Sequence, residues 1–161
     1  MRPAPPCRCN NDSGSGTEPH DDVVQETWLA VIRGLDGCWN GNLTSIGASP
    51  FADQQTAPCW VEISHDGRYL FTVNTAQPSI SSYVVNRDGS LTLLGSTPFK
   101  NPTGLAPVDA RLSPDGSLLS VVDGGTAQVS TFRVQGGALT ELASSPTALP
   151  AGSAPFGIVT S

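Results

Sequence analysis

One unit of about 48 residues occurs twice in this sequence and constrains what the chain can fold into. Residues 58–98 begin PCWVEISHDGRYLFTVN and end DGSLTLLGSTP, while residues 107–146 begin PVDARLSPDGSLLSVVD and end GGALTELASSP. Pro58 and Asp66 recur 49 residues later, and Leu91 recurs 48 residues later. A fixed period of this length, filled with short strands and turn signals, predicts the blades of a β-propeller.

Each unit predicts one four-stranded antiparallel blade. Asp66, Asp88 and Asp115 precede glycine between hydrophobic runs and are predicted to form hairpin turns. The expected fold is all-β: a partial β-propeller over residues 41–161, with two complete blades and partial blades on either side. The hydrophobic runs predict strands at 59–63, 69–74, 79–85 and 91–95, then at 108–112, 118–123, 128–134 and 139–143, with flanking strands at 43–46 and 156–160.

Residues 1–40 form a separate leader in composition. The first 20 residues are mostly polar, proline and glycine, and such a segment cannot bury enough apolar surface to offset the entropy of ordering, so disorder is expected. Residues 21–35 place apolar side chains at helical spacing and predict a short helix. The alternative is that Thr27 to Arg33 form a third strand of an incomplete blade.

Composition excludes several functional classes. Eight Lys and Arg stand against 14 Asp and Glu, for a net charge of −6, so no basic face is expected and nucleic-acid binding is excluded. No apolar run approaches the roughly 18 residues that cross a bilayer, so no membrane association is expected. The N-terminus lacks the apolar segment of a secretory signal, which favours a cytoplasmic protein.

The cysteines and histidines predict neither a metal site nor a cofactor site. Cys7 and Cys9 are too closely spaced for a usual zinc pair, and His20 and His65 are not arranged as their partners. We therefore expect unpaired thiols, with Cys59 as a small buried hydrophobe.

The motifs within the repeat resemble a known family. Residues 66–74, DGRYLFTVN, are similar to the DGRYLYVTN pattern of lactonase-type seven-bladed propellers, which include propeller-class 6-phosphogluconolactonases and carboxymuconate cyclases. The segments SPDGS at 113–117, DGSLTLLGSTPF at 88–99 and APFGIV at 154–159 support the resemblance, which covers residues 41–161. It implies hydrolysis of sugar lactones such as 6-phosphogluconolactone, without an obligatory redox cofactor. The alternative is a non-catalytic propeller module that serves as a binding surface.

The chain departs from the family in two motifs and in length. The Pro-Arg-His triplet that family members often carry at the first strand is absent, and Thr75 and Gly124 stand where the cyclase branch tends to have glutamate. Seven blades need roughly 340 residues at the observed period. The chain therefore resembles the C-terminal third of such a propeller, and its open blade faces predict self-association.

Five residues are candidates for a ligand site, because propeller ligands usually lie where the first strand of a blade begins and the second ends. Asp109 and Asp123 are candidate general bases for a water that attacks a lactone carbonyl. Asn74 and Asn101 are candidates for binding sugar hydroxyls, and Trp60 for stacking on a sugar ring. The alternative for Asn74 and Asp123 is that they satisfy backbone groups in turns.

Two other polar positions are assigned structural roles. His65 lies in the turn after the first strand, at the opposite end of the blade, and is expected to be a solvent-exposed turn residue. Glu62 and Arg111 occupy equivalent positions 49 residues apart and are expected to pair across the two blades.

Overall fold

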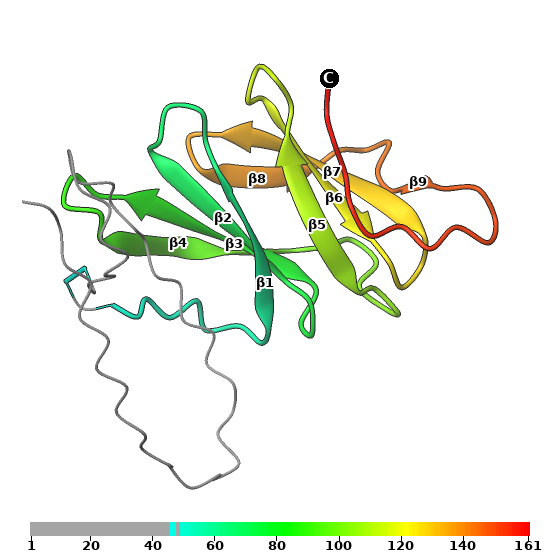
Figure 1. Cartoon of the computed structure of the whole chain (residues 1–161), viewed down its shortest axis with the longest axis horizontal. Coiled ribbons are helices and arrows are strands. Elements are labelled where there is room, and N and C mark those ends of the chain that lie inside the picture. Colours follow the sequence, from blue (N-terminus) through cyan, green and yellow to red (C-terminus); the bar gives the residue numbers. More distant parts are fainter. Residues whose placement is uncertain (1–45, 48) are drawn as a thin grey trace, which may run out of the picture.

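The computed structural model describes residues 46–47 and 49–161, which contain nine β-strands and no helix (Figure 1). The predicted leader, its helix at 21–35 or strand at 27–33, and nearly all of the predicted strand at 43–46 lie outside these residues. The strands are β1 (Pro58–Ile63), β2 (Tyr69–Asn74), β3 (Ser79–Val85), β4 (Leu91–Pro98), β5 (Pro107–Leu112), β6 (Leu118–Asp123), β7 (Gln128–Gln135), β8 (Ala138–Glu141) and β9 (Thr147–Ala148).

The strands form two antiparallel sheets that lie face to face. The first has the order β1-β2-β3-β4, and the second has the order β5-β6-β7-β8 with β9 also paired to β7. Strands β1 to β4 and strands β5 to β8 each form a meander, and the two sheets pack face to face as successive blades (Figure 1). The all-β prediction and the eight strands of the two complete blades are confirmed.

The fourth strand of the second blade, predicted at 139–143, is β8 at Ala138–Glu141, and a further short strand, β9, follows Pro146. Proline at position 146 has no N–H to donate to a ladder. Between β8 and β9 the Leu142 N–H donates to the Thr131 carbonyl oxygen at 2.9 Å. Side chains supply the other contacts: the Thr131 N–H donates to Ser145 Oγ at 3.0 Å, and Ser145 Oγ donates to Glu141 Oε1 at 2.7 Å. β9 then resumes the pairing with the start of β7.

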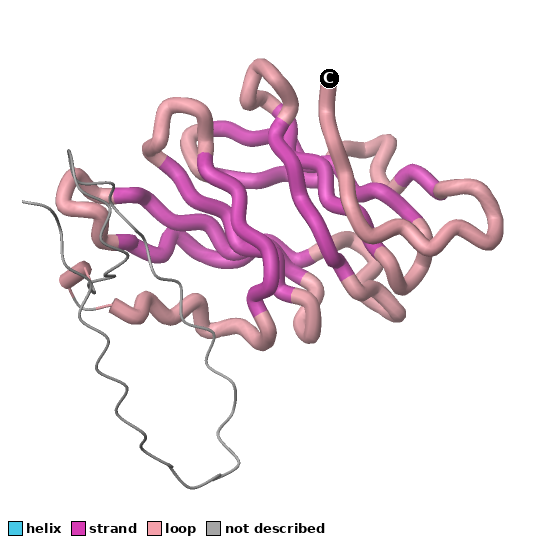
Figure 2. The backbone as a smooth tube through the Cα atoms, viewed as in Figure 1, coloured by secondary structure: helices cyan, strands magenta, loops and turns pink. Residues whose placement is uncertain are grey.

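The predicted strand at 156–160 is wrong, because these residues form no strand (Figure 2). They lie alongside β5, where the Ile158 N–H donates to Asp109 Oδ2 at 2.9 Å and Thr160 Oγ1 donates to the Leu112 carbonyl at 2.6 Å. A strand requires a backbone ladder with a neighbour. Within the part of the chain that the structure describes, no second strand pairs with this segment.

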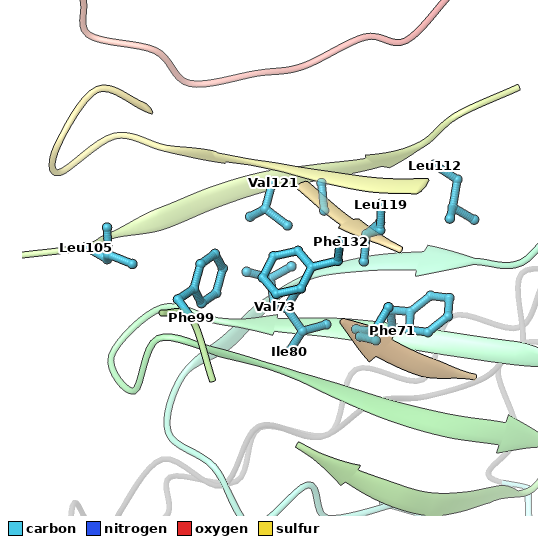
Figure 3. Close-up of a cluster of buried hydrophobic side chains, with 11 residues drawn as sticks. Phe71, Val73, Ile80, Phe99, Leu105, Leu112, Leu119, Val121 and Phe132 are labelled. Atoms are coloured by element: carbon cyan, nitrogen blue, oxygen red, sulfur yellow. The ribbon is translucent and has the colours of Figure 1, made fainter. Parts of the chain in front are cut away.

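The largest core fills the space between the two sheets (Figure 3). Phe71, Val73 and Ile80 of the first sheet face Phe132 and other side chains of the second sheet, and all are essentially inaccessible to solvent. Phe99, from the linker between the sheets, meets Phe132 edge to face with ring centroids 5.2 Å apart. The remaining buried members of this core are Leu105, Ala110, Leu112, Leu119, Val121 and Leu139.

Cys59 is exposed, so the prediction that it is a buried hydrophobe is wrong. Alternate residues of β1 point to opposite faces, and Trp60 packs toward the second blade. Cys59, Val61 and Ile63 therefore face away from that blade, and the two aliphatic side chains are 43% and 49% exposed. The thiol of Cys59 is free, as expected.

The hairpin turns use the aspartates that the sequence singled out. Asp66 Oδ1 accepts from the Ser64 hydroxyl at 2.6 Å and from the Arg68 N–H at 3.1 Å. Asp115 Oδ1 likewise accepts from the Ser113 hydroxyl at 2.5 Å and from the Ser117 N–H at 3.0 Å. The glycines that follow have φ values of 69° and 71°, in the region that only glycine enters freely. The predicted turn roles are confirmed, including that of Asp88, which accepts from the Ser90 N–H at 3.0 Å.

A polar contact fixes the inner strands of the two blades against each other. Glu62 Oε2 lies 3.4 Å from Arg111 Nη1, as the sequence predicts. Glu62 Oε1 also accepts the backbone N–H of Leu112 at 3.1 Å. The Glu62 side chain is 13% exposed, whereas the Arg111 side chain is 50% exposed. The backbone bond is therefore the better shielded of the two and is expected to contribute more.

We expect Phe132→Ala to lower the free energy of unfolding by about 3–5 kcal/mol, because it leaves a cavity between the two sheets. Urea unfolding followed by circular dichroism measures the change. Phe156→Ala is a matched control, since Phe156 is 71% exposed and its loss is expected to cost under about 0.5–1 kcal/mol. Equal losses in the two variants would contradict a core centred between the blades.

Substitutions at the blade junction are expected to follow a defined order. Glu62→Ala removes both contacts and leaves the buried Leu112 N–H unpaired, at a cost of about 1–3 kcal/mol. Glu62→Gln retains an acceptor for that N–H, and Arg111→Met removes only a half-exposed ion pair, so each is expected to cost under about 1 kcal/mol. Urea unfolding at low and high salt tests the order. An Arg111→Met loss as large as that of Glu62→Ala would overturn it.

The turn at Asp115 predicts a pH dependence of stability. Hydrogen bonds from the Ser113 hydroxyl and the Ser117 N–H lower the pKa of Asp115 from its ordinary 3.8 to about 2. Because the folded pKa is depressed, the stabilisation by this carboxylate is present above pH 3.8 and is lost as the pH falls toward 2. The difference in urea midpoint between the wild type and Asp115→Asn is therefore expected to shrink across this window, and a constant difference would contradict the assignment.

Candidate functional site

The strand register brings four of the predicted site residues to one end of the two blades. Pro58 pairs with Asn74 at this end of the first blade, and Pro107 pairs with Asp123 at the same end of the second. Trp60 and Asp109 follow these prolines on the inner strands β1 and β5. His65 lies exposed in the β1–β2 turn at the opposite end, as predicted.

Asp109 is half-buried and is oriented by backbone groups. Its Oδ1 accepts the N–H of Ala110 at 2.8 Å, and its Oδ2 accepts the N–H of Ile158 at 2.9 Å. An ionised carboxylate offers about four lone-pair sites, so each oxygen can still accept one further hydrogen bond. The C-terminal segment thus fixes the Asp109 carboxylate without saturating it.

Trp60 contacts the same C-terminal segment as Asp109. Its ring meets that of Phe156 edge to face, with centroids 6.1 Å apart and planes at 82°. Trp60 is half-buried against the main core, whereas Phe156 is 71% exposed. The exposed ring is that of Phe156, which lies two positions before Ile158, whose N–H contacts Asp109.

Asp123 is fully buried and is occupied by loop groups. Its Oδ1 accepts the N–H groups of Ala106 at 2.9 Å and Gly125 at 2.7 Å, while its Oδ2 accepts the Thr126 hydroxyl at 3.1 Å. Gly125 is required here, because a Cβ on it would lie 2.3 Å from the carbonyl oxygen of Gly104. These contacts are those of the turn-forming alternative, and they join the linker after β4 to the β6–β7 loop.

Asn74 is also fully buried, but it contacts side chains. Its Nδ2 donates to Ser79 Oγ at 2.9 Å and Ser81 Oγ at 3.0 Å, and no donor contacts its Oδ1. Ser81 in turn donates to Asp53 Oδ2 at 3.5 Å. Burial, together with the negative charge of Asp53, raises the pKa of the neighbouring Tyr83 phenol well above its ordinary value.

Asn101 stands apart from the other four candidates. It is exposed in the linker between β4 and β5, where the neighbouring Lys100 is fixed to the second blade. The Lys100 N–H donates to Glu141 Oε2 at 2.7 Å, and its ammonium group contacts the carbonyl oxygen of Leu142.

Sequence reasoning missed Phe156 and Ile158 as neighbours of Trp60 and Asp109. The signal was available in the repeat: Ile158 lies 49 residues after Asp109, the same interval that separates Glu62 from Arg111. Residues one period apart on inner strands face each other across neighbouring blades.

Neither a metal site nor a membrane-spanning helix is found among the described residues. Residues 46–47 and 49–161 hold no group of three His, Cys, Asp or Glu side chains that could bind a metal ion. The same ranges contain no helix long and apolar enough to cross a membrane.

The comparison with protein families identifies the fold. The family model for "Lactonase, 7-bladed beta-propeller" matches residues 38–159. The chain belongs to this lactonase family. The match agrees with the extent of the resemblance found from the motifs, and it makes the two sheets successive blades of a lactonase-type propeller. Among curated proteins, none matches the chain.

Solved structures share the fold of this lactonase segment. A protein from Lactobacillus plantarum matches with a TM-score of 0.59 and 24% identity over 68% of this chain and 33% of its own. Proposed 6-phosphogluconolactonases from Bacteroides fragilis and Bacteroides uniformis match with TM-scores of 0.56 and 0.54 and identities of 24% and 18%. These cover 65% and 63% of this chain and 33% and 32% of their own. The chain therefore spans about a third of the length of the structures it resembles.

Proposed function

We propose that this chain is a segment of a propeller that hydrolyses sugar lactones such as 6-phosphogluconolactone in the cytoplasm. The family match over residues 38–159 carries the proposal. Two solved structures that share its fold are proposed 6-phosphogluconolactonases, which supports the choice of substrate. Because the chain spans about a third of those structures, a complete site is expected to need further blades.

In this proposal Asp109 is the general base. A water molecule attacks the lactone carbonyl carbon while its proton passes to the Asp109 carboxylate. The bond between the carbonyl carbon and the ring oxygen then breaks, and the ring oxygen takes the proton to give the open sugar acid. The N–H groups of Ala110 and Ile158 hold the carboxylate in one orientation while leaving it room to accept the proton. No electrons are transferred, so no redox cofactor is required.

Except for Asn101, the remaining candidates take binding and positioning roles. Trp60 offers an apolar ring for the CH face of a sugar. Asn101 stands apart from Asp109 and Trp60, so it takes no part in this site. Asp123 and Asn74 are buried, so we assign them the positioning of the β6–β7 and β2–β3 loops. This differs from the sequence-based hypothesis that Asp123 is itself a base.

A second candidate function is a non-catalytic interaction module. Apolar side chains are exposed on both outer sides of the blade pair: Val61 and Ile63 on β1, and Phe156 and Val159 in the C-terminal segment, the latter 90% exposed. Exposed apolar groups of this kind mark surfaces that bind other proteins. The partner in this proposal is a second copy of the chain, as the open blade faces predict.

Lactone hydrolysis and solution mass together test the two candidates. We expect hydrolysis of 6-phosphogluconolactone by the purified chain only if light scattering shows a discrete oligomer. Asp109→Asn is then expected to lower kcat about 10²–10⁴-fold, because the attacking water loses its base. Asp88→Asn, in the outer β3–β4 hairpin, is the matched control and is expected to leave kcat unchanged.

The possible outcomes separate the candidates. An active oligomer in which Asp109→Asn retains full kcat would rule out Asp109 as the base. A discrete oligomer without lactonase activity would favour the interaction module. A 16.7 kDa monomer without activity would refute both functions for the chain by itself.

A further inference from the structure

A pocket of about 320 Å³ opens beside the first blade, away from the inner strands. The β2–β3 loop contributes Gln77 and Pro78, and the end of β4 contributes Ser96 and Pro98. Pro102 of the interblade linker and Gln55, which precedes β1, complete the wall together with Ser79. Neither Asp109 nor Trp60 lines this pocket, so it is separate from the proposed lactone site.

One buried polar residue, Ser79, lines this largely apolar pocket and leaves hydrogen-bonding capacity unused. Ser79 is 4% exposed, and its hydroxyl lies 3.1 Å from Gln55 Oε1 and 2.8 Å from the Gln77 carbonyl oxygen. One hydroxyl proton serves one of these acceptors at a time, so the other remains available to a ligand. Gln55 and Gln77 therefore give the wall hydrogen-bond acceptors beside its proline rings.

The segment that supplies Gln55 is held in an unfavourable backbone conformation. Gln54 and Ala57 have backbone φ values of 60° and 55°, which residues other than glycine rarely adopt. The Gln55 N–H donates to Asp53 Oδ1 at 2.9 Å, which ties this strained segment to the buried Asp53. Strain of this kind is typical of functional sites, where surrounding contacts hold a residue in place.

The charge around the pocket selects against anions. Every lining residue is uncharged, so no group there can pair with a phosphate or a carboxylate. The Asp53 carboxylate lies behind the wall, connected to Ser79 through Ser81 and Asn74. Its negative charge disfavours an anionic ligand in the pocket. The proline rings offer apolar surface, and the amides and hydroxyls offer both donors and acceptors.

We infer that this pocket binds an uncharged, hydroxyl-rich small molecule, a neutral sugar or polyol. Its hydroxyl groups would donate to Gln55 Oε1 and to the serine oxygens, and its CH groups would pack on Pro78 and Pro98. The volume lies at the lower end of the range for small-molecule sites, which fits a single monosaccharide. This inference does not depend on lactonase activity, because neither Asp109 nor Trp60 lines the pocket.

Binding is tested by titrating the full chain, labelled with ¹⁵N, with D-glucose and separately with glucose 6-phosphate. We expect glucose to shift the backbone amides of Ser79 and Ser96 and the side-chain amides of Gln55 and Gln77. Glucose 6-phosphate is expected to bind at least tenfold more weakly. Ser96→Trp fills the pocket from an exposed edge strand and is expected to lower the glucose affinity at least tenfold.

Thr140→Trp is the matched control, because it places the same ring on an exposed position of β8 in the other blade. It is expected to leave glucose binding unchanged. Comparing the spectrum of each variant with that of the wild type shows whether the variant is folded. Three results would each overturn the inference: no shifts up to about 100 mM glucose, equal binding by Ser96→Trp, or binding of glucose 6-phosphate as tight as that of glucose.

Discussion

The apolar layer between the two sheets is the interaction on which the rest of the structure depends. Each sheet carries a face of buried aromatic and aliphatic side chains, with Phe71 and Val73 on one side and Phe132 on the other. Burying each such side chain contributes roughly 1.5–3 kcal/mol, provided that the neighbouring sheet covers it. Neither sheet could bury this face alone. Each repeat therefore supplies one sheet, but the apolar core is buried only where two sheets pack together.

Polar contacts at the inner strands set how the two blades meet. Glu62 accepts the Leu112 N–H, and Thr75 Oγ1 donates to the carbonyl oxygen of Pro107 at 2.9 Å. These bonds fix the register between the blades, which the apolar layer by itself would leave adjustable. The same register places Ile158 against Asp109, so the geometry of the proposed lactone site follows from the packing of the blades.

The fold could be predicted almost entirely from the sequence, because its signals are local. Hydrophobic runs gave the strands, and aspartate followed by glycine gave the hairpins, since both depend on residues close together in the chain. The predicted strand at 156–160 failed, because a strand needs a backbone partner as well as local propensity. This segment has no second strand paired with it among the described residues.

The candidate site was predicted less completely, because burial and contacts depend on distant segments. The period placed Asp109 and Asp123 at one end of the blades, but only the tertiary structure showed that their burial and hydrogen-bonding partners differ. Asp123 is closed off by linker and loop N–H groups, whereas Asp109 keeps accepting capacity beside the C-terminal segment. The sequence by itself determined the blade, its strands and its family. Tertiary structure alone decided which polar groups are occupied, since their partners come from other segments: Ala106 lies 17 residues from Asp123, and Ile158 lies 49 residues from Asp109.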